Sequence, residues 1–204
     1  MVGEGVLMEC LQNNRVSEIL LVNRKHYEIN NPKVTELLVS DFMKAEEYAA
    51  ALKGYDACFY CAGISSIGLN EADYTRITYN TTIHFAEILA SLNPQLVFHY
   101  VTGGHTDSSE NGKVMWARIK GRTENKLMTM SFKGQYNYRP GFMKPFKEQK
   151  NVKSIFKIFG FIFENLLPKQ SLTLEQVGRA MINNTLTSYS KQILEIADIK
   201  QAAL

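Results

Sequence analysis

The chain has 204 residues, a length that fits one domain of ordinary size and is short for two. Its 23 basic and 20 acidic side chains leave a net charge of +3, too even a balance to favour nucleic acid as the main partner. No apolar run reaches the roughly 18 residues that a membrane span requires, and the N-terminus lacks a signal-peptide pattern. We therefore expect one cytoplasmic domain over residues 1–204.

Helix and strand patterns alternate along the chain. Apolar spacing predicts helices at 3–11, 44–52, 71–92 and 114–131, and strands at 16–22, 34–39, 55–62, 96–101, 135–138 and 192–197. Such alternation is typical of right-handed βαβ units. The predicted fold class is α/β, a doubly wound parallel sheet with helices on both faces. Ligands of such sheets bind at the carboxyl ends of the strands, which places the expected site there.

The helix predicted at 114–131 has an unusual polar edge. Trp116, the only tryptophan, precedes Lys120 by four residues, so the two side chains share one helix face. Met115 and Ile119 give the helix an apolar side to bury. The pattern leaves open whether the polar edge performs chemistry, holds a ligand or, for Trp116, simply packs in the core.

Three cysteines are too few for a disulfide scaffold, so reduced thiols are expected. Cys58 and Cys61 form a C-x-x-C, but they fall in a predicted strand, where residues three apart point to opposite faces. This geometry favours packing over redox chemistry. The four histidines have no metal-like spacing with cysteines or carboxylates, and we predict no metal site.

Short motifs near the strand ends resemble those of a known family. The first seven residues, MVGEGVL, look like the second half of a T-G-A-T-G-x-V-G-x-x-x-L fingerprint, with Gly3 as its last glycine. The tripeptide at 61–63 resembles the family's N-A-G element, and the one at 139–141 resembles its R-P-G. On these residues the chain resembles the short-chain dehydrogenase/reductase superfamily, in the atypical or extended branch with epimerase-like and Tat-interacting-protein-like members. The resemblance implies a Rossmann-like fold.

The same resemblance implies a nucleotide cofactor, NADP rather than NAD. Arg24 follows the second strand of the family pattern, where a guanidinium pairs with a 2′-phosphate and NAD enzymes usually carry an acidic residue. An ordinary solvated cation is the alternative for Arg24, and Asp41 is equally suited to cap the next helix. The implied cofactor-binding residues are Gly3, Arg24, Lys25, Asp41, Phe42, Cys61, Ala62, Gly63, Asn80, Lys120, Arg139, Pro140 and Gly141.

The chain departs from the family pattern in two places. The first two fingerprint glycines and the strand before them are missing, so we expect a truncated version of a longer protein, by roughly a dozen residues. The family's Tyr-x-x-x-Lys is here Trp116-x-x-x-Lys120, and an indole does not exchange a proton as a phenol does. The resemblance thus implies a catalytic set of Thr102, Trp116 and Lys120 in which Lys120 holds ribose and the acid–base position is altered.

Beyond Gly141 the composition becomes basic and apolar. The resemblance implies that 142–190 forms a small helical substrate cap, and 142–167 is a candidate interface with a second copy or another protein. We favour a cap or interface over a membrane surface, because apolar patches more often meet protein or ligand.

Two functions remain. One is an NADP-dependent oxidoreductase or epimerase-like enzyme acting on an unknown small molecule. The other is a non-catalytic NADP-binding regulatory or scaffold protein.

Overall fold

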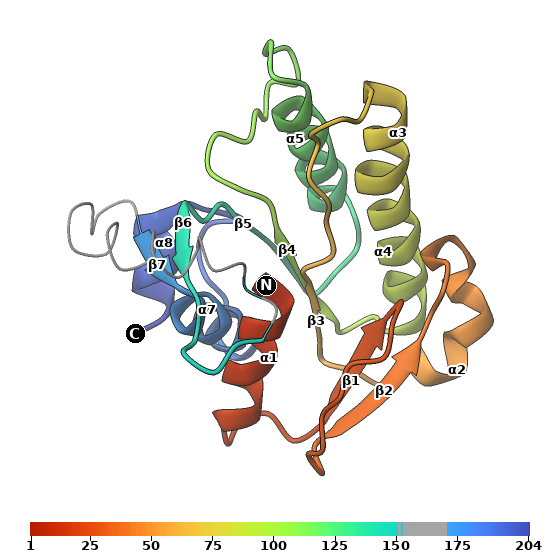
Figure 1. The fold of residues 1–204 in the computed structure, drawn as a ribbon, viewed down its shortest axis with the longest axis vertical. Coiled ribbons are helices and arrows are strands. Elements are labelled where there is room, and N and C mark those ends of the chain that lie inside the picture. Colours follow the sequence, from red (N-terminus) through yellow and green to blue (C-terminus); the bar gives the residue numbers. More distant parts are fainter. Residues whose placement is uncertain (151, 153–170) are drawn as a thin grey trace.

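The computed structural model describes residues 1–150, 152 and 171–204 (Figure 1). In chain order the elements are α1 (Val2–Gln12), β1 (Ile19–Asn23), β2 (Val34–Leu38), the 3-10 segment η1 (Phe42–Tyr48), α2 (Ala49–Leu52), β3 (Ala57–Tyr60), α3 (Glu71–Thr75), the π-helical segment η2 (Arg76–Asn80), α4 (Thr81–Leu92), β4 (Val97–Val101), α5 (Met115–Met128), β5 (Gly134–Tyr138), β6 (Phe142–Lys144), β7 (Ser171–Thr173), α7 (Leu174–Leu186), β8 (Ile193–Leu194) and α8 (Ile196–Ala202).

All strand pairs in the described residues are parallel. The central sheet has the order β3-β4-β5-β8, while β1 pairs with β2 and β6 with β7. Helices α3, α4 and α5 lie on one side of the strands, and α1, α7 and α8 lie on the other (Figure 1). The predicted α/β class, with parallel strands and helices on both faces, is confirmed.

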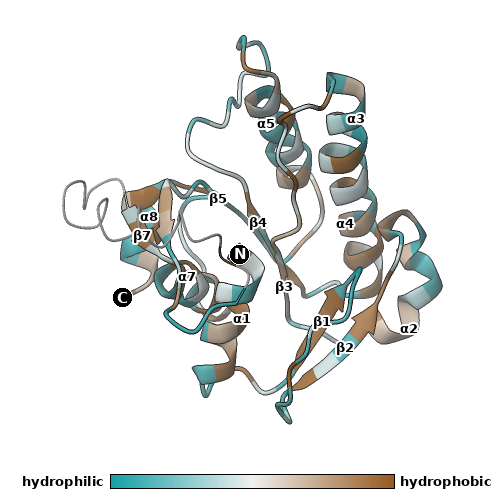
Figure 2. Cartoon of the chain, viewed as in Figure 1, coloured by the Kyte–Doolittle hydropathy of each residue, from teal (hydrophilic) through white to brown (hydrophobic). Residues whose placement is uncertain are grey.

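Two apolar cores lie on the two faces of the strands. Because strand side chains alternate, Val97 and Val101 of β4 enter the core beneath α1, α7 and α8, whereas Phe98 and Tyr100 enter the core beneath α4 and α5. The helices carry apolar and polar residues on different sides, visible as mixed brown and teal in Figure 2. Burial of these apolar faces from both sides holds the layers together.

The strand layer is divided between β1 and β3. Side chains of both strands enter the same two cores, with Ile19 and Phe59 in one and Leu20 and Tyr60 in the other. Nevertheless, no hydrogen-bonded ladder joins β1 to β3 in the part of the chain that the structure describes. Each of these strands therefore has one edge without a strand partner there, at the place where the family resemblance predicts a further strand.

The predicted helix at 71–92 is a continuous helix of three parts, α3, η2 and α4. Asn70 caps its start, where its side chain accepts a hydrogen bond from the backbone N–H of Asp73. Within η2 the ladder changes register, because the Arg76 carbonyl accepts from both the backbone N–H and the hydroxyl of Thr81, five residues on. Such π turns add one residue to a helix and change which side chains face its neighbours.

Several predicted boundaries were wrong for identifiable reasons. The helix expected at 44–52 is a 3-10 segment followed by one α turn, with a non-helical backbone at Lys44. The strand predicted at 192–197 ends at Leu194, because Glu195 caps α8 and Asp198 occupies the third helical position. The spacing Thr173-x-x-Gln176 predicts a capping box, and the structure has this box at the start of α7.

The strand pair β6–β7 was not predicted from the sequence. Most of the expected cap or interface at 142–167 falls on residues 151 and 153–170, outside the described residues, and the division into one domain with a cap stays a prediction. Among the described helices, none combines the length and apolar character needed to cross a membrane.

Candidate functional site

A cavity of about 310 Å³ lies where β3 and β4 end and α1 begins. It has apolar and polar walls, and its lining residues are Met1, Val2, Gly3, Cys61, Ala62, Gly63, Ile64, Tyr74, Thr78, Tyr100, Val101, Thr102, Lys120 and Met143. This is the carboxyl end of the parallel strands, the edge predicted from the sequence. Gly3, 61–63, Thr102 and Lys120, which the sequence nominated separately, meet here.

The N-terminus of α1 faces this cavity. The first backbone N–H groups of a helix have no partner within the helix, and the helix dipole places partial positive charge beside them, so such an end favours anions. Gly3 packs closely on β3: a Cβ added there would lie 3.4 Å from Cβ of Cys61, whereas a Cβ on Gly63 would meet nothing within 4 Å. The backbone at 61–63 thus leaves open space beside the helix end.

Lys120 contributes a cationic side chain to the lining. Its ammonium group donates a hydrogen bond to the Thr102 carbonyl oxygen at 2.8 Å. Burial lowers the pKa of Lys120, and the charge of Glu124, one helical turn on, partly opposes this effect. The ammonium retains two further N–H donors for a ligand.

Behind this wall lies a buried ion pair between Glu124 and Arg139. Glu124 has no exposed surface, and its carboxylate accepts hydrogen bonds from Nε and Nη2 of Arg139 and from the Thr102 hydroxyl, the last at 2.6 Å. Arg139 also reaches Ser108 Oγ and Glu195 Oε1, at 2.5 and 3.3 Å. The Thr102 hydroxyl therefore points to a carboxylate, and the guanidinium expected to contact a cofactor is already paired within the protein.

Arg139 begins a turn that packs on the loop after β4. The Pro140 carbonyl accepts a hydrogen bond from the Gly104 N–H at 2.9 Å, and Gly104 lies close to Gly141. Residues 139–141 reach the correct end of the sheet but do not line the cavity. Their assignment as cofactor contacts stays a prediction.

Two aromatic hydroxyl residues and one threonine in the lining were missed by the sequence reasoning. Tyr74 and Thr78 lie one helical turn apart, and Tyr100 is on β4; all three are buried. Burial raises the pKa of Tyr74 and of Tyr100. The four-residue spacing of Tyr74 and Thr78 was the available signal, because it places two hydroxyl groups on one helix face.

Trp116 does not line the cavity, although it precedes Lys120 by one helical turn. Its side chain is half-buried on α5. The sequence reasoning placed both residues on one face, but that face is wider than the cavity wall. A role for Trp116 at the reacting atoms stays a prediction without a contact to support it.

The other nominated residues lie outside this cavity. Arg24 and Lys25 are exposed after β1, and within the described residues Arg24 forms no hydrogen bond or ion pair. Asp41 caps η1 by accepting from the Met43 N–H at 3.0 Å, and Phe42 packs edge-on against Phe85. Asn80, at the end of η2, is exposed.

The C-x-x-C cysteines have the arrangement predicted for packing. Cys58 faces one core and Cys61 the other, and both are free thiols. Burial raises the pKa of both, that of Cys61 to about 12. A thiolate is therefore disfavoured at either position.

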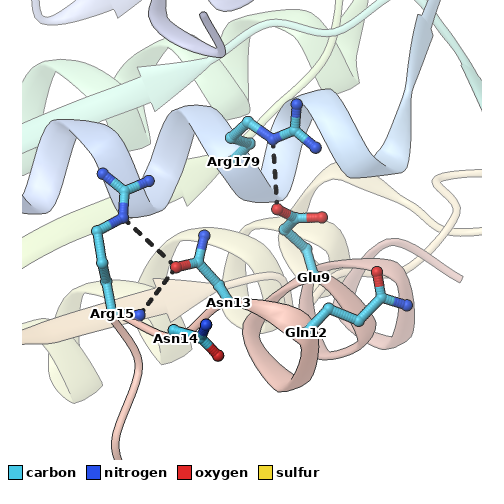
Figure 3. Close-up of a pocket in the computed structure, with 6 residues that line it drawn as sticks. All are labelled: Glu9, Gln12, Asn13, Asn14, Arg15 and Arg179. Carbon is cyan, nitrogen blue, oxygen red and sulfur yellow. Dashed lines mark hydrogen bonds and ion pairs between the residues drawn. The ribbon is translucent and has the colours of Figure 1, made fainter.

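A second hollow, of about 450 Å³, lies at the other end of α1 (Figure 3). All of its lining side chains are polar: Glu9, Gln12, Asn13, Asn14, Arg15 and Arg179. These side chains largely satisfy each other, with Arg179 paired to Glu9 and Arg15 bonded to Asn13. Although larger, this hollow is more open and lacks the apolar walls typical of ligand sites, so the cavity at the strand ends is the stronger candidate.

Solved structures share the architecture of this chain. The chain is similar to the enzyme WbmF of Bordetella bronchiseptica in complex with NAD+ and UDP, with a TM-score of 0.67 and 16% identity over 98% of this chain and 72% of that one. It is also similar to UDP-glucose 4-epimerase of Thermotoga maritima with UDP-glucose, with a TM-score of 0.66 and 11% identity over 98% of this chain and 77% of that one. The fold is Rossmann-like α/β, as in these two proteins.

The chain is also similar in sequence to a known protein. The chain is 25% identical over 195 residues to Protein HTATIP2 of Rattus norvegicus, across 94% of this chain and 79% of that protein. No family model matches the chain. Together with the fold, this similarity confirms the resemblance to the atypical branch of the short-chain dehydrogenase/reductase superfamily.

Proposed function

We propose that this protein binds NADP with the nicotinamide end in the cavity, and that it acts as an oxidoreductase or epimerase-like enzyme. The observation that carries the proposal is the single cavity that joins the N-terminus of α1, the ends of β3 and β4, and Lys120. A helix N-terminus suits a pyrophosphate, and an ammonium group suits ribose hydroxyls.

The residues present fit such a cofactor. A volume of about 310 Å³ accommodates one ring and its neighbours, so the remainder of a dinucleotide must extend out of the cavity. We assign Arg24, which directly follows β1, to the part of the dinucleotide that extends out of the cavity. An exposed guanidinium that no described residue pairs is suited to a 2′-phosphate, and this favours NADP over NAD.

Different residues of the cavity lining have different roles in this proposal. A bound nicotinamide supplies or accepts a hydride. Lys120 orients the ligand through its remaining N–H donors, and the apolar side chains of Ile64, Val101 and Met143 exclude water. Tyr74 and Tyr100 contribute phenol groups to the lining, and burial raises the pKa of both, so each keeps its proton at neutral pH.

A second candidate function is cofactor binding without catalysis. It is favoured by two observations: Trp116 lies outside the lining, and the Thr102 hydroxyl is bonded to Glu124. In this arrangement the side chain at the altered acid–base position lies outside the cavity, and the Thr102 hydroxyl is already engaged by a carboxylate. In this alternative, bound NADP would serve as a structural or sensed ligand.

Fluorescence titration with NADPH and NADH tests the cofactor assignment. Arg24→Ala should weaken NADPH binding about 10-fold, because one charge-assisted contact to phosphate is lost, and should leave NADH binding within about 2-fold. Arg76→Ala removes the same charge from a surface pair with Asp73 and serves as the matched control. Equal losses for both nucleotides in Arg24→Ala, or tighter wild-type binding of NADH, would contradict the NADP assignment.

Oxidation of NADPH in the presence of a panel of aldehydes and ketones separates the two functions. Turnover supports the enzyme. Binding of NADPH without turnover across the panel supports the non-catalytic alternative, and absence of nucleotide binding refutes both.

A further inference from the structure

Thr78 presents a buried hydroxyl group that has no hydrogen-bond partner. The residue is 6% exposed, lies in the π-helical segment η2 and lines the cavity. The Thr78 hydroxyl is the buried side-chain polar group left unpaired in the part of the chain that the structure describes. Proteins rarely leave such groups unsatisfied outside functional sites, because water can no longer solvate them.

Other helical threonines of this chain show how such a hydroxyl is normally satisfied. Thr82, Thr123 and Thr185 each donate to the carbonyl oxygen four residues earlier, at 2.6, 2.7 and 2.9 Å. Thr78 does not donate to the corresponding carbonyl of Tyr74. The Tyr74 phenol lies near enough for its pKa to be lowered somewhat by the Thr78 hydroxyl, against the larger effect of burial, but the pair does not meet hydrogen-bond geometry.

The surroundings of Thr78 define what could satisfy it. The cavity combines apolar walls with three kinds of hydrogen-bond donor: the Thr78 hydroxyl, the phenols of Tyr74 and Tyr100, and the Lys120 ammonium. None of the described residues that line it is a carboxylate. Donor-bearing side chains beside apolar walls select an oxygen acceptor on a ligand with an apolar body.

We propose that the Thr78 hydroxyl donates a hydrogen bond to a carbonyl oxygen of the cavity ligand. Resting on the proposed function, this inference names the chemistry of that site: the carbonyl belongs either to a small aldehyde or ketone substrate with an apolar body or to the carboxamide of nicotinamide. Thr78 is thereby a specificity residue, held by η2 in a conformation that costs stability until a ligand is bound.

The proposal predicts opposite effects of Thr78→Val on stability and on binding. Valine has the same shape and lacks the hydroxyl, so the free protein should gain about 2–4 °C in Tm, since an unpaired buried group is removed. Binding of the carbonyl-bearing ligand should weaken about 5–10-fold, since its partner is lost. Thr78→Ser should restore most of the affinity.

Thr82→Val is the matched control. Thr82 is buried on the same helix, does not line the cavity, and its hydroxyl is already bonded. This variant should show no gain in Tm and no change in ligand binding. A merely structural role for Thr78 would lower Tm in both variants and leave binding unchanged in both.

The titrations separate the two sources of the carbonyl. Weaker NADPH binding in Thr78→Val assigns the hydroxyl to the carboxamide, whereas unchanged NADPH binding with a raised KM for aldehydes or ketones assigns it to the substrate. A lowered Tm of the free protein, or a raised Tm with both binding constants unchanged, overturns the proposal.

The experiments can refute the proposed function without refuting the inference about Thr78. If the wild-type protein binds neither NADPH nor NADH, that function is wrong, and ligand-observed NMR with nicotinamide and cyclohexanone decides the inference alone. Binding of either compound that weakens in Thr78→Val supports it, and no binding overturns it.

Discussion

His99 should make the stability of this protein fall between pH 7 and pH 5. The residue has no exposed surface, and its ring nitrogens contact the Tyr138 hydroxyl at 3.0 Å and the Thr185 hydroxyl at 2.9 Å. Its ring packs edge-on against Phe59 at 4.9 Å between centroids. Burial without a charged partner lowers the pKa of His99 from 6.5 to about 3.

The direction of this change in stability follows from proton binding to the folded and unfolded states. Between these two pKa values the unfolded chain binds a proton at this position and the folded protein does not, so lowering the pH favours unfolding. The loss begins as pH falls through 6.5 and grows to about 2 kcal/mol at pH 5, from about 1.4 kcal/mol for each pH unit. This loss depends little on the pKa of His99 in the folded protein, because any pKa below about 4 gives nearly the same loss at pH 5.

Urea denaturation of the wild type and of His99→Gln at pH 5, 6 and 7 measures the effect. Glutamine retains hydrogen-bonding groups but does not titrate, so the difference in unfolding free energy between the two proteins should shrink by about 2 kcal/mol from pH 7 to pH 5. Surface histidines and carboxylates titrate in both proteins and cancel in this difference. Parallel stability curves for the two proteins would refute the reasoning.

Two further variants probe the cavity wall. Glu124→Gln leaves the Arg139 guanidinium without its buried counter-charge, and we expect a loss of about 3 kcal/mol or more in denaturant unfolding; a loss below about 1 kcal/mol would show that the pair is not a stabilising contact. Because Trp116 does not line the cavity, Trp116→Tyr should change NADPH turnover with aldehydes by less than about 2-fold; a large gain would place residue 116 at the reacting atoms.

The alternation of helices and strands could be predicted because each element carries its own periodicity. The capping box at Thr173 and the opposite faces of Cys58 and Cys61 follow from local spacing alone, and both were predicted. Lys120 was nominated by its fit to the family's Tyr-x-x-x-Lys pattern, and it lines the cavity.

The parts that could not be predicted depend on contacts between distant residues. Arg139 was expected at a cofactor, but Glu124 and Glu195 reach it from two other elements. Pairing of β6 with β7 joins segments almost 30 residues apart, for which the sequence holds no local signal. Boundaries failed where capping decided them, as at Glu195.

The cavity lies at the carboxyl edge, where the sequence predicted the site, but only part of the cavity lining was nominated from the sequence. Gly3, Thr102 and Lys120 were found by their fit to motifs. Tyr74 and Thr78 belong to no motif, and their orientation depends on a π turn that periodicity does not show.

That π turn sets the rotational phase between two halves of one helix. Each residue advances an α-helix by about 100°, so one added residue rotates everything before it by that amount relative to everything after it. Phe85 and Leu89 of α4 can therefore stay seated in the core while Tyr74 and Thr78 turn toward the cavity. Deleting one residue from η2 would rotate the residues before the turn relative to α4. The molecule would keep its core and lose the hydroxyl-bearing side of its cavity.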